Sequence, residues 1–180
     1  MSHRSLNKNI IIISTILILS VLLSACSGVK VDERITTDSV HVSSDNACRG
    51  FFQSLYEDDS ALFEECFYKD ALDGEDTDAW EMLRSNVDED AVFVGTKHIA
   101  TRPCDEENGL DYDTVLENIA FFNDVDSEVI EDIVLVSVEI FFKVDGKYKS
   151  IEIYSIVFKA DGGWYFFSPV DVTAKKVKDS

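Results

Sequence analysis

Carboxylates are spread throughout the sequence, and two acidic runs, at residues 73–78 and 124–128, have a spacing that could attract calcium. Clustered carboxylates are the ligands that Ca²⁺ prefers, and an EF-hand loop also needs glycine at its sixth position and glutamate at its twelfth. A loop that starts at Asp73 places Asp78 and Arg84 at these positions, and the second run fails in the same way. We therefore expect solvated loops and no metal site.

Nitrogen and sulfur ligands are equally sparse. His98 and Cys104 lie six residues apart, and a zinc site would need further ligands from distant parts of the chain. The sequence has no Gly-x-Ser-x-Gly nucleophile elbow and no phosphate-binding glycine loop. We assign no catalytic residue and no cofactor, and an enzyme is the less favoured interpretation, with His98 as its candidate base.

The first 28 residues have the three-part pattern of a secretory signal. Arg4 and Lys8 form a short basic segment, and residues 10–23 form an apolar run of 14 residues that is followed by small residues. A membrane-spanning helix needs about 20 apolar residues. The run is therefore better interpreted as a signal peptide that is removed after export.

The segment Leu23-Ser24-Ala25-Cys26 resembles the lipobox of bacterial lipoproteins. The resemblance implies that the thiol of Cys26 receives a diacylglycerol with acyl chains such as palmitate, and that cleavage follows Ala25. Two chains anchor stably, because each buried methylene contributes about 0.8 kcal/mol and one chain alone binds weakly. We expect a lipid-anchored protein at the cell membrane that faces outside the cytoplasm. The alternative is an ordinary signal peptide and an unmodified cysteine.

The chain without residues 1–25 carries 14 Lys and Arg against 35 Asp and Glu, a net charge near −21. This acidic balance would repel phosphate backbones, so nucleic acid is not an expected partner. It would also repel an anionic membrane, so lipid alone is expected to tether the domain. The apolar content suffices for the core of one domain.

Three cysteines, Cys48, Cys66 and Cys104, follow the lipobox. A disulfide is permitted outside the cytoplasm, but an odd number leaves at least one free thiol. A continuous helix would separate Cys48 from Cys66 by about 27 Å, beyond the 7 Å or so that a disulfide allows. Any bridge is therefore expected to use Cys104, with Cys66 as its partner. Three reduced, buried thiols are an equal alternative.

The chain divides into four parts by composition and periodicity. Residues 1–25 are the signal peptide, and residues 26–44 are small, polar or charged without a sustained period, as in a lipidated flexible tether. Residues 45–170 form the predicted domain, and residues 171–180 form a polar tail. No internal repeat is present.

Helices are predicted mainly in the first half of the domain. Apolar residues recur at helical spacing in four segments, at 47–56, 62–67, 80–87 and 115–122. Gly50 lies within the first of these, where it costs some helix stability and permits close packing of a neighbouring element.

Strands dominate the rest of the domain, at 91–102, 132–144, 148–160 and 164–170, with a hairpin turn at Asp145-Gly146. One face of the second strand is wholly apolar and is expected to meet the core. Its residues are Val134, Val136, Val138, Ile140, Phe142 and Val144.

Helices followed by long antiparallel strands predict an α+β domain whose N-terminal helices pack on one face of a curved antiparallel sheet. The helical opening at 47–56, the end of the second helix at Phe67-Tyr68 and the final hairpin at 161–166 are similar to NTF2-like, or cystatin-like, domains. The resemblance spans residues 45–170. It implies a cone with a pocket between sheet and helices but no single function.

Five residues are candidates to line that pocket, because ligand sites are rich in aromatic rings with few polar groups. They are Tyr112, Glu139, Tyr154, Trp164 and Tyr165. The alternatives are core packing for the aromatic residues and an outward-facing, solvated position for Glu139.

The favoured function is a non-catalytic domain, anchored by Cys26, that binds a small ligand or an envelope protein. One alternative is an NTF2-like enzyme, a small hydrolase or isomerase, which would need His98 and an acid to converge in one cavity with a shifted pKa. The other is an accessory subunit of a cell-envelope complex, which predicts a filled cone and an exposed apolar patch.

Overall fold

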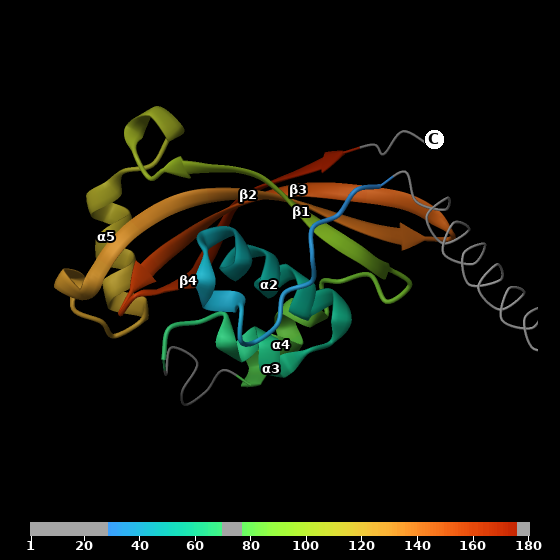
Figure 1. The fold of residues 1–180 in the computed structure, drawn as a ribbon, viewed down its shortest axis with the longest axis horizontal. Coiled ribbons are helices and arrows are strands. Elements are labelled where there is room, and N and C mark those ends of the chain that lie inside the picture. The colour runs from blue at the N-terminus through green and yellow to red at the C-terminus, as the bar shows by residue number, and fades with distance from the viewer. Residues whose placement is uncertain (1–28, 70–76, 176–180) are drawn as a thin grey trace, which may run out of the picture. The chain divides into compact units, whose positions relative to one another are not determined.

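The computed structural model describes residues 29–69 and 77–175, which contain four α-helices and a four-stranded antiparallel sheet (Figure 1). The predicted α+β class is therefore confirmed. The elements in chain order are α2 (Ser44–Glu57), α3 (Ser60–Glu65), α4 (Thr77–Arg84), β1 (Val92–Pro103), α5 (Tyr112–Phe122), β2 (Ile130–Val144), β3 (Lys147–Ala160) and β4 (Gly163–Lys175).

The strands follow one another in the sheet in the order β1-β2-β3-β4. Asp145 and Gly146 join β2 to β3, and their φ angles of 53° and 74° are those of the predicted two-residue turn. Strand β4 continues to Lys175, which pairs with Ser150. The predicted end of the strand at 170 was wrong, because ladder pairing with β3 extends the strand into the segment assigned to the polar tail.

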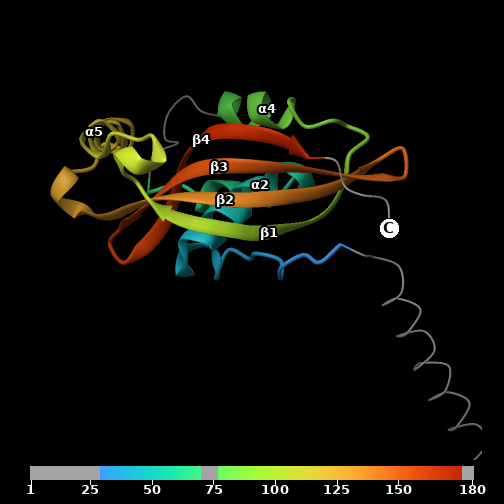
Figure 2. The same cartoon turned by 90° about the horizontal axis from the view of Figure 1, so that it is seen from above.

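Strands β2 and β3 arch over α2, which lies against one face of the sheet (Figures 1 and 2). The predicted core face of β2 meets this helix, and Val136, Val138 and Ile140 are fully buried. The ring of Phe51 on α2 stacks on that of Phe166 on β4, with centroids 3.7 Å apart and planes within 6°. This stack joins the helix to the edge strand of the sheet.

Helix α5 lies at one end of the sheet, far from the β2–β3 turn (Figures 1 and 2). Its Val115 and Ile119 are buried in a second cluster with Ile133 and Phe158. Phe122, expected on the same side of the helix as Val115 and Ile119, is 65% exposed. The buried stripe of α5 therefore ends at Ile119.

The segment before α2 belongs to the folded unit, which begins at Val31. Ile35 and Val40 are buried in the main core, and both would meet a side chain placed at Gly50. The side chain of Gln53 accepts from the Ile35 N–H at 2.9 Å and donates to the Ile35 carbonyl at 3.0 Å. The tether predicted for residues 26–44 is therefore too long, since its second half packs on the domain.

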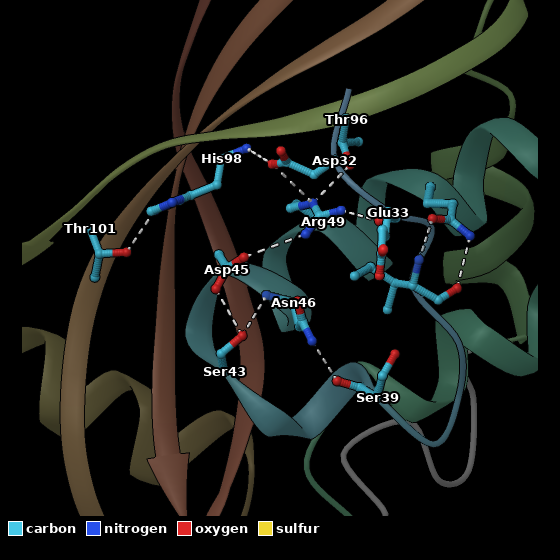
Figure 3. Close-up of polar contacts among 12 residues, drawn as sticks. Asp32, Glu33, Ser39, Ser43, Asp45, Asn46, Arg49, Thr96, His98 and Thr101 are labelled. Carbon is cyan, nitrogen blue, oxygen red and sulfur yellow. Dashed lines mark hydrogen bonds and ion pairs between the residues drawn. The ribbon is translucent and has the colours of Figure 1, made fainter. Parts of the chain in front are cut away.

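A buried arginine also holds this segment. The Arg49 Nε donates to Thr96 Oγ1 on β1 at 3.0 Å, and the same guanidinium donates to the carbonyl of Glu33 (Figure 3). Asp45 lies 3.5 Å away and Asp32 4.0 Å away, so two carboxylates balance the buried charge. Arg49 thus connects α2, β1 and the N-terminal segment.

The three thiols of the domain are free and buried. The disulfide between Cys66 and Cys104 is therefore absent, and the two residues belong to different core clusters. Asp58 ends α2 in the left-handed conformation, with φ 59°, and α3 turns back so that Cys48 and Cys66 share one cluster. The continuous-helix distance does not apply, because the chain reverses between the two cysteines.

Replacing Gln53 by methionine should lower the free energy of unfolding by about 2–6 kcal/mol. The variant leaves the buried N–H and carbonyl of Ile35 without partners, and each unsatisfied group costs about 1–3 kcal/mol. Urea unfolding followed by circular dichroism measures the change. Thr36→Val removes an exposed hydrogen bond in the same segment and should cost less than about 0.5 kcal/mol. Equal losses in both variants would show that Gln53 does not hold the segment.

Stability should fall as the pH rises above about 9. Burial raises the pKa of the Cys48 thiol from 9.0 to about 12, and burial also raises the pKa of Cys66. Between these values an unfolded thiol releases its proton while the native thiol keeps it, so alkaline pH favours unfolding by about 1.4 kcal/mol per pH unit and thiol. Urea titrations above that pH should give a shallower decline for Cys48→Ala. An unchanged slope would count against the prediction.

Candidate functional site

A pocket of about 280 Å³ lies where α2 meets α4, the middle of β3 and β4. Five phenylalanine rings form much of its wall, and they are Phe51, Phe52, Phe67, Phe166 and Phe167. Helix α4 and the turn after it contribute Leu83 and Val87, and β3 contributes Ile151 and Ile153. The wall is therefore built from the same apolar faces that form the core of the domain.

Two residues of the wall carry polar side-chain groups, Tyr56 and Asn86. Burial and the nearby carboxylate of Asp88 raise the pKa of Tyr56, so its phenol is neutral at physiological pH. The Asn86 side chain donates to the Met82 carbonyl at 2.9 Å. In the described part of the chain no charged residue lines the pocket, which suits an uncharged group.

The size of the pocket limits what it can hold. Small-molecule sites commonly have volumes of about 300–1,000 Å³, so this one lies at the lower end of the range. Its rings offer flat faces and edges to an aromatic or aliphatic group. The geometry therefore fits a single ring or a short acyl chain, and the polar side chains that the described residues offer to it are the Tyr56 phenol and the Asn86 amide.

None of the five predicted lining residues contributes to this wall. Tyr112 begins α5 and is 40% exposed. Tyr165 contacts the rings of His41 and Tyr68, and the Trp164 carbonyl lies 2.9 Å from His41 Nδ1. Trp164 packs against the main core cluster that contains α2, but it lies outside the wall, whereas Phe166 and Phe167 of the same strand line the pocket.

Glu139 and Tyr154 are also away from the pocket, on the sheet face opposite α2. Glu139 pairs directly with Glu152 across β2 and β3. The hydroxyl of Ser150 donates to Glu139 at 2.7 Å, and that of Ser137 donates to Glu152 at 2.6 Å. Opposed carboxylates repel, and these hydroxyl donors offset part of that cost. Glu139 and Glu152 are thus held by hydrogen bonds within the sheet and do not line the pocket.

His98 lies on β1, outside the pocket. Its Nε2 is 3.0 Å from Thr101 Oγ1, and its backbone N–H donates to Asp32 Oδ2 at 2.6 Å (Figure 3). Among the described residues, the pocket wall contains neither this histidine nor a carboxylate. His98 and an acid therefore do not converge in that cavity.

The pocket residues were predicted as core and not as a site. Phe51, Leu55, Leu83 and Val87 all fit the helical periodicity of the first half of the domain. Such a period identifies the buried face of a helix, but it contains no information on whether neighbouring elements fill the space against that face. No other signal in the sequence marks the pocket.

Several predicted features fall outside the described residues, namely the signal peptide with Ala25, the lipid-bearing Cys26 and most of the acidic run at 73–78. Within 29–69 and 77–175, no helix has the length and apolar character to cross a bilayer. The same ranges contain no group of three or more His, Cys, Asp or Glu residues arranged to bind a metal ion.

The pocket can bind an uncharged group, and the polar clusters around Arg49 and Glu152 hold elements of the fold together. Comparison with known proteins finds no family model, no curated protein and no solved structure that matches the chain.

Proposed function

We propose that the protein is a lipid-anchored domain, exposed outside the cytoplasm, that binds a small apolar ligand without catalysing a reaction. The observation that carries this proposal is the apolar pocket between α2, α4 and the sheet. Its wall of phenylalanine rings excludes charged groups, and its volume of about 280 Å³ fits one ring or a short acyl chain.

The anchor is supported by the N-terminal pattern. A basic segment, an apolar run of 14 residues and the sequence Leu23-Ser24-Ala25-Cys26 together resemble the signal of bacterial lipoproteins. A diacylglycerol on Cys26 would make the cell membrane the first partner of the protein. Three reduced thiols are compatible with an exported chain, because each is buried away from oxidants in the solvent.

An NTF2-like, or cystatin-like, cone is the architecture that we propose for residues 45–170. Its supports are the long helix α2 on the inner face of an arched sheet and a pocket at the boundary between helices and sheet (Figure 1). Domains of this type use the same cavity for different chemistries. The wall of this pocket supports binding, since it offers rings and aliphatic groups to a ligand.

The pocket should bind a neutral apolar probe, and a bulky residue in its wall should displace that probe. Ile151→Trp places a large ring in the pocket, and we expect it to weaken binding of N-phenyl-1-naphthylamine at least about tenfold. Fluorescence titration measures the affinity. The matched control is Val92→Trp, because Val92 is 64% exposed on β1 and lies outside the wall.

Equal affinities in the two tryptophan variants would remove the pocket from the proposal. Both variants must retain the unfolding midpoint of the parent chain, so that a lost fold is not mistaken for a filled pocket. The chain used for this experiment should begin no later than Val31, since Ile35 and Val40 belong to the core. Native mass spectrometry of protein from the producing cells should then show an extra mass that is lost on unfolding.

Lipid attachment should depend on Cys26 and on no other cysteine. Cells fed an alkyne analogue of palmitate should label the parent chain and Cys104→Ser, whereas Cys26→Ser should lose the label. Cys104 is the matched control because it is a thiol of the folded domain, only 4% exposed. A mature chain that starts elsewhere, or a label that survives in Cys26→Ser, would exclude the proposed anchor.

A further inference from the structure

The charges of the domain are separated along the sheet. Residues 105–132, which include α5 and the loops around it, contain 11 Asp and Glu and no Lys or Arg. At the other end of the sheet, the β2–β3 hairpin at 143–149 contains three lysines and one acid, Asp145. The two ends lie on opposite sides of the unit in both views (Figures 1 and 2). The hairpin thus carries a local charge of about +2 in a chain with a net charge near −21, and the acidic turn Asp88–Asp90 lies at the same end, just before Val92, which pairs with Lys143.

The hairpin tip presents its cations to solvent. Lys147 and Lys149 are exposed, and the Lys143 Nζ lies 4.5 Å from the centre of the Tyr148 ring. Among the described residues, none of these three lysines has an ion-pair partner. Elsewhere, Lys69 pairs with Asp161 at 2.7 Å and Lys159 pairs with Glu131 at 2.6 Å. The tip thus combines unpaired cations with an amphipathic ring, the composition of a surface that contacts lipid headgroups.

The chain also enters the folded unit at this end. Val31 would meet a side chain placed at Gly95, and the Asp32 N–H donates to the Thr96 carbonyl at 2.8 Å. Gly95 pairs with Phe141, two residues before Lys143. Four residues separate Cys26 from Val31, so the connection has five Cα–Cα steps, and at about 3.6 Å per step a fully extended chain spans at most about 18 Å. A lipid on Cys26 would therefore hold the hairpin close to the bilayer.

We propose that the β2–β3 hairpin, residues 143–149, docks on the anionic surface of the bilayer in which Cys26 is anchored. This inference rests on the proposed lipid anchor. Each lysine near an anionic leaflet strengthens association about fivefold, and the effect decays within a Debye length of about 8–10 Å. The acidic end is repelled by the same field. Attraction at one end and repulsion at the other orient the domain with α5, and the exposed Phe121 and Phe122, away from the membrane.

Amine acylation of the mature lipidated chain tests the docking without any substitution. The chain is reconstituted in vesicles of phosphatidylglycerol or phosphatidylcholine, and mass spectrometry measures the acylation rate of each lysine. On phosphatidylglycerol the rates of Lys147 and Lys149 should fall about fivefold relative to phosphatidylcholine. The rates of Lys69 and Lys159, near the β3–β4 turn, should not change. About 1 M salt should abolish the difference, since the Debye length is then about 3 Å.

Protection that is equal on both lipids, or equal at all four lysines, would overturn the docking. A second pair of variants removes the same charge at each end. Lys147→Gln with Lys149→Gln should abolish the lipid-dependent protection of Lys143, whereas Lys69→Gln with Lys159→Gln should leave it intact. Loss of protection in both pairs of variants would also overturn the proposal, because the net charge of the chain, rather than the position of its lysines, would then explain the protection.

The intact mass of the reconstituted chain separates this inference from the proposed function. A diacylglycerol mass on Cys26 with unprotected hairpin lysines would refute the docking alone. A chain without lipid on Cys26 would refute the anchor, and with it the docking. Protection of the hairpin in cells that disappears in protein-free vesicles of phosphatidylglycerol would assign the tip to a protein partner and overturn the membrane as its occupant.

Discussion

Helix α2 is buried on every side from Ala47 to Leu55, and this constraint shapes the rest of the domain. A helix that is buried on all sides usually has apolar residues on every face, but this one contains Arg49, Gln53 and Ser54. Buried polar groups are costly unless they are hydrogen-bonded. The sheet covers one side of the helix with Phe166 and the valines of β2, and Thr96 on β1 accepts from Arg49. Ser54 donates to the Phe51 carbonyl within the helix, so the remaining partners must come from elsewhere.

The N-terminal segment supplies those partners. The backbone of Ile35 satisfies both ends of the Gln53 amide, and the carbonyl of Glu33 accepts from Arg49. Gly50 allows Ile35 and Val40 to approach the helix between these two polar residues. The helix and the segment therefore need each other, which places the boundary of the folded unit near Val31. With this boundary, four residues separate Cys26 from the folded unit, which is the condition on which the proposed docking of the hairpin depends.

The sequence predicted those parts of the fold that depend on local pattern. Strict alternation along β2 and the turn residues Asp145 and Gly146 determine the central hairpin, since each is read from adjacent residues. The ordered segment before α2 could not be predicted, because Ile35 is 18 residues from its partner Gln53 and has no periodic neighbours. The end of β4 was missed for a similar reason, since polar residues there are held by pairing with β3.

The same limit applies to the candidate site. Composition predicted repulsion between the acidic domain and an anionic membrane, but net charge does not reveal that residues 105–132 and 143–149 lie at opposite ends of a sheet.

The position of the hairpin also affects how a ligand would reach the pocket. Ile151 in the pocket wall is five residues from Gly146, or about 17 Å along the strand at about 3.3 Å per residue. If the hairpin rests on the bilayer, the pocket lies within a short distance of the headgroups. An apolar ligand could then pass from the membrane to the pocket with little exposure to water, because transfer through water is the costly step for an acyl chain or ring.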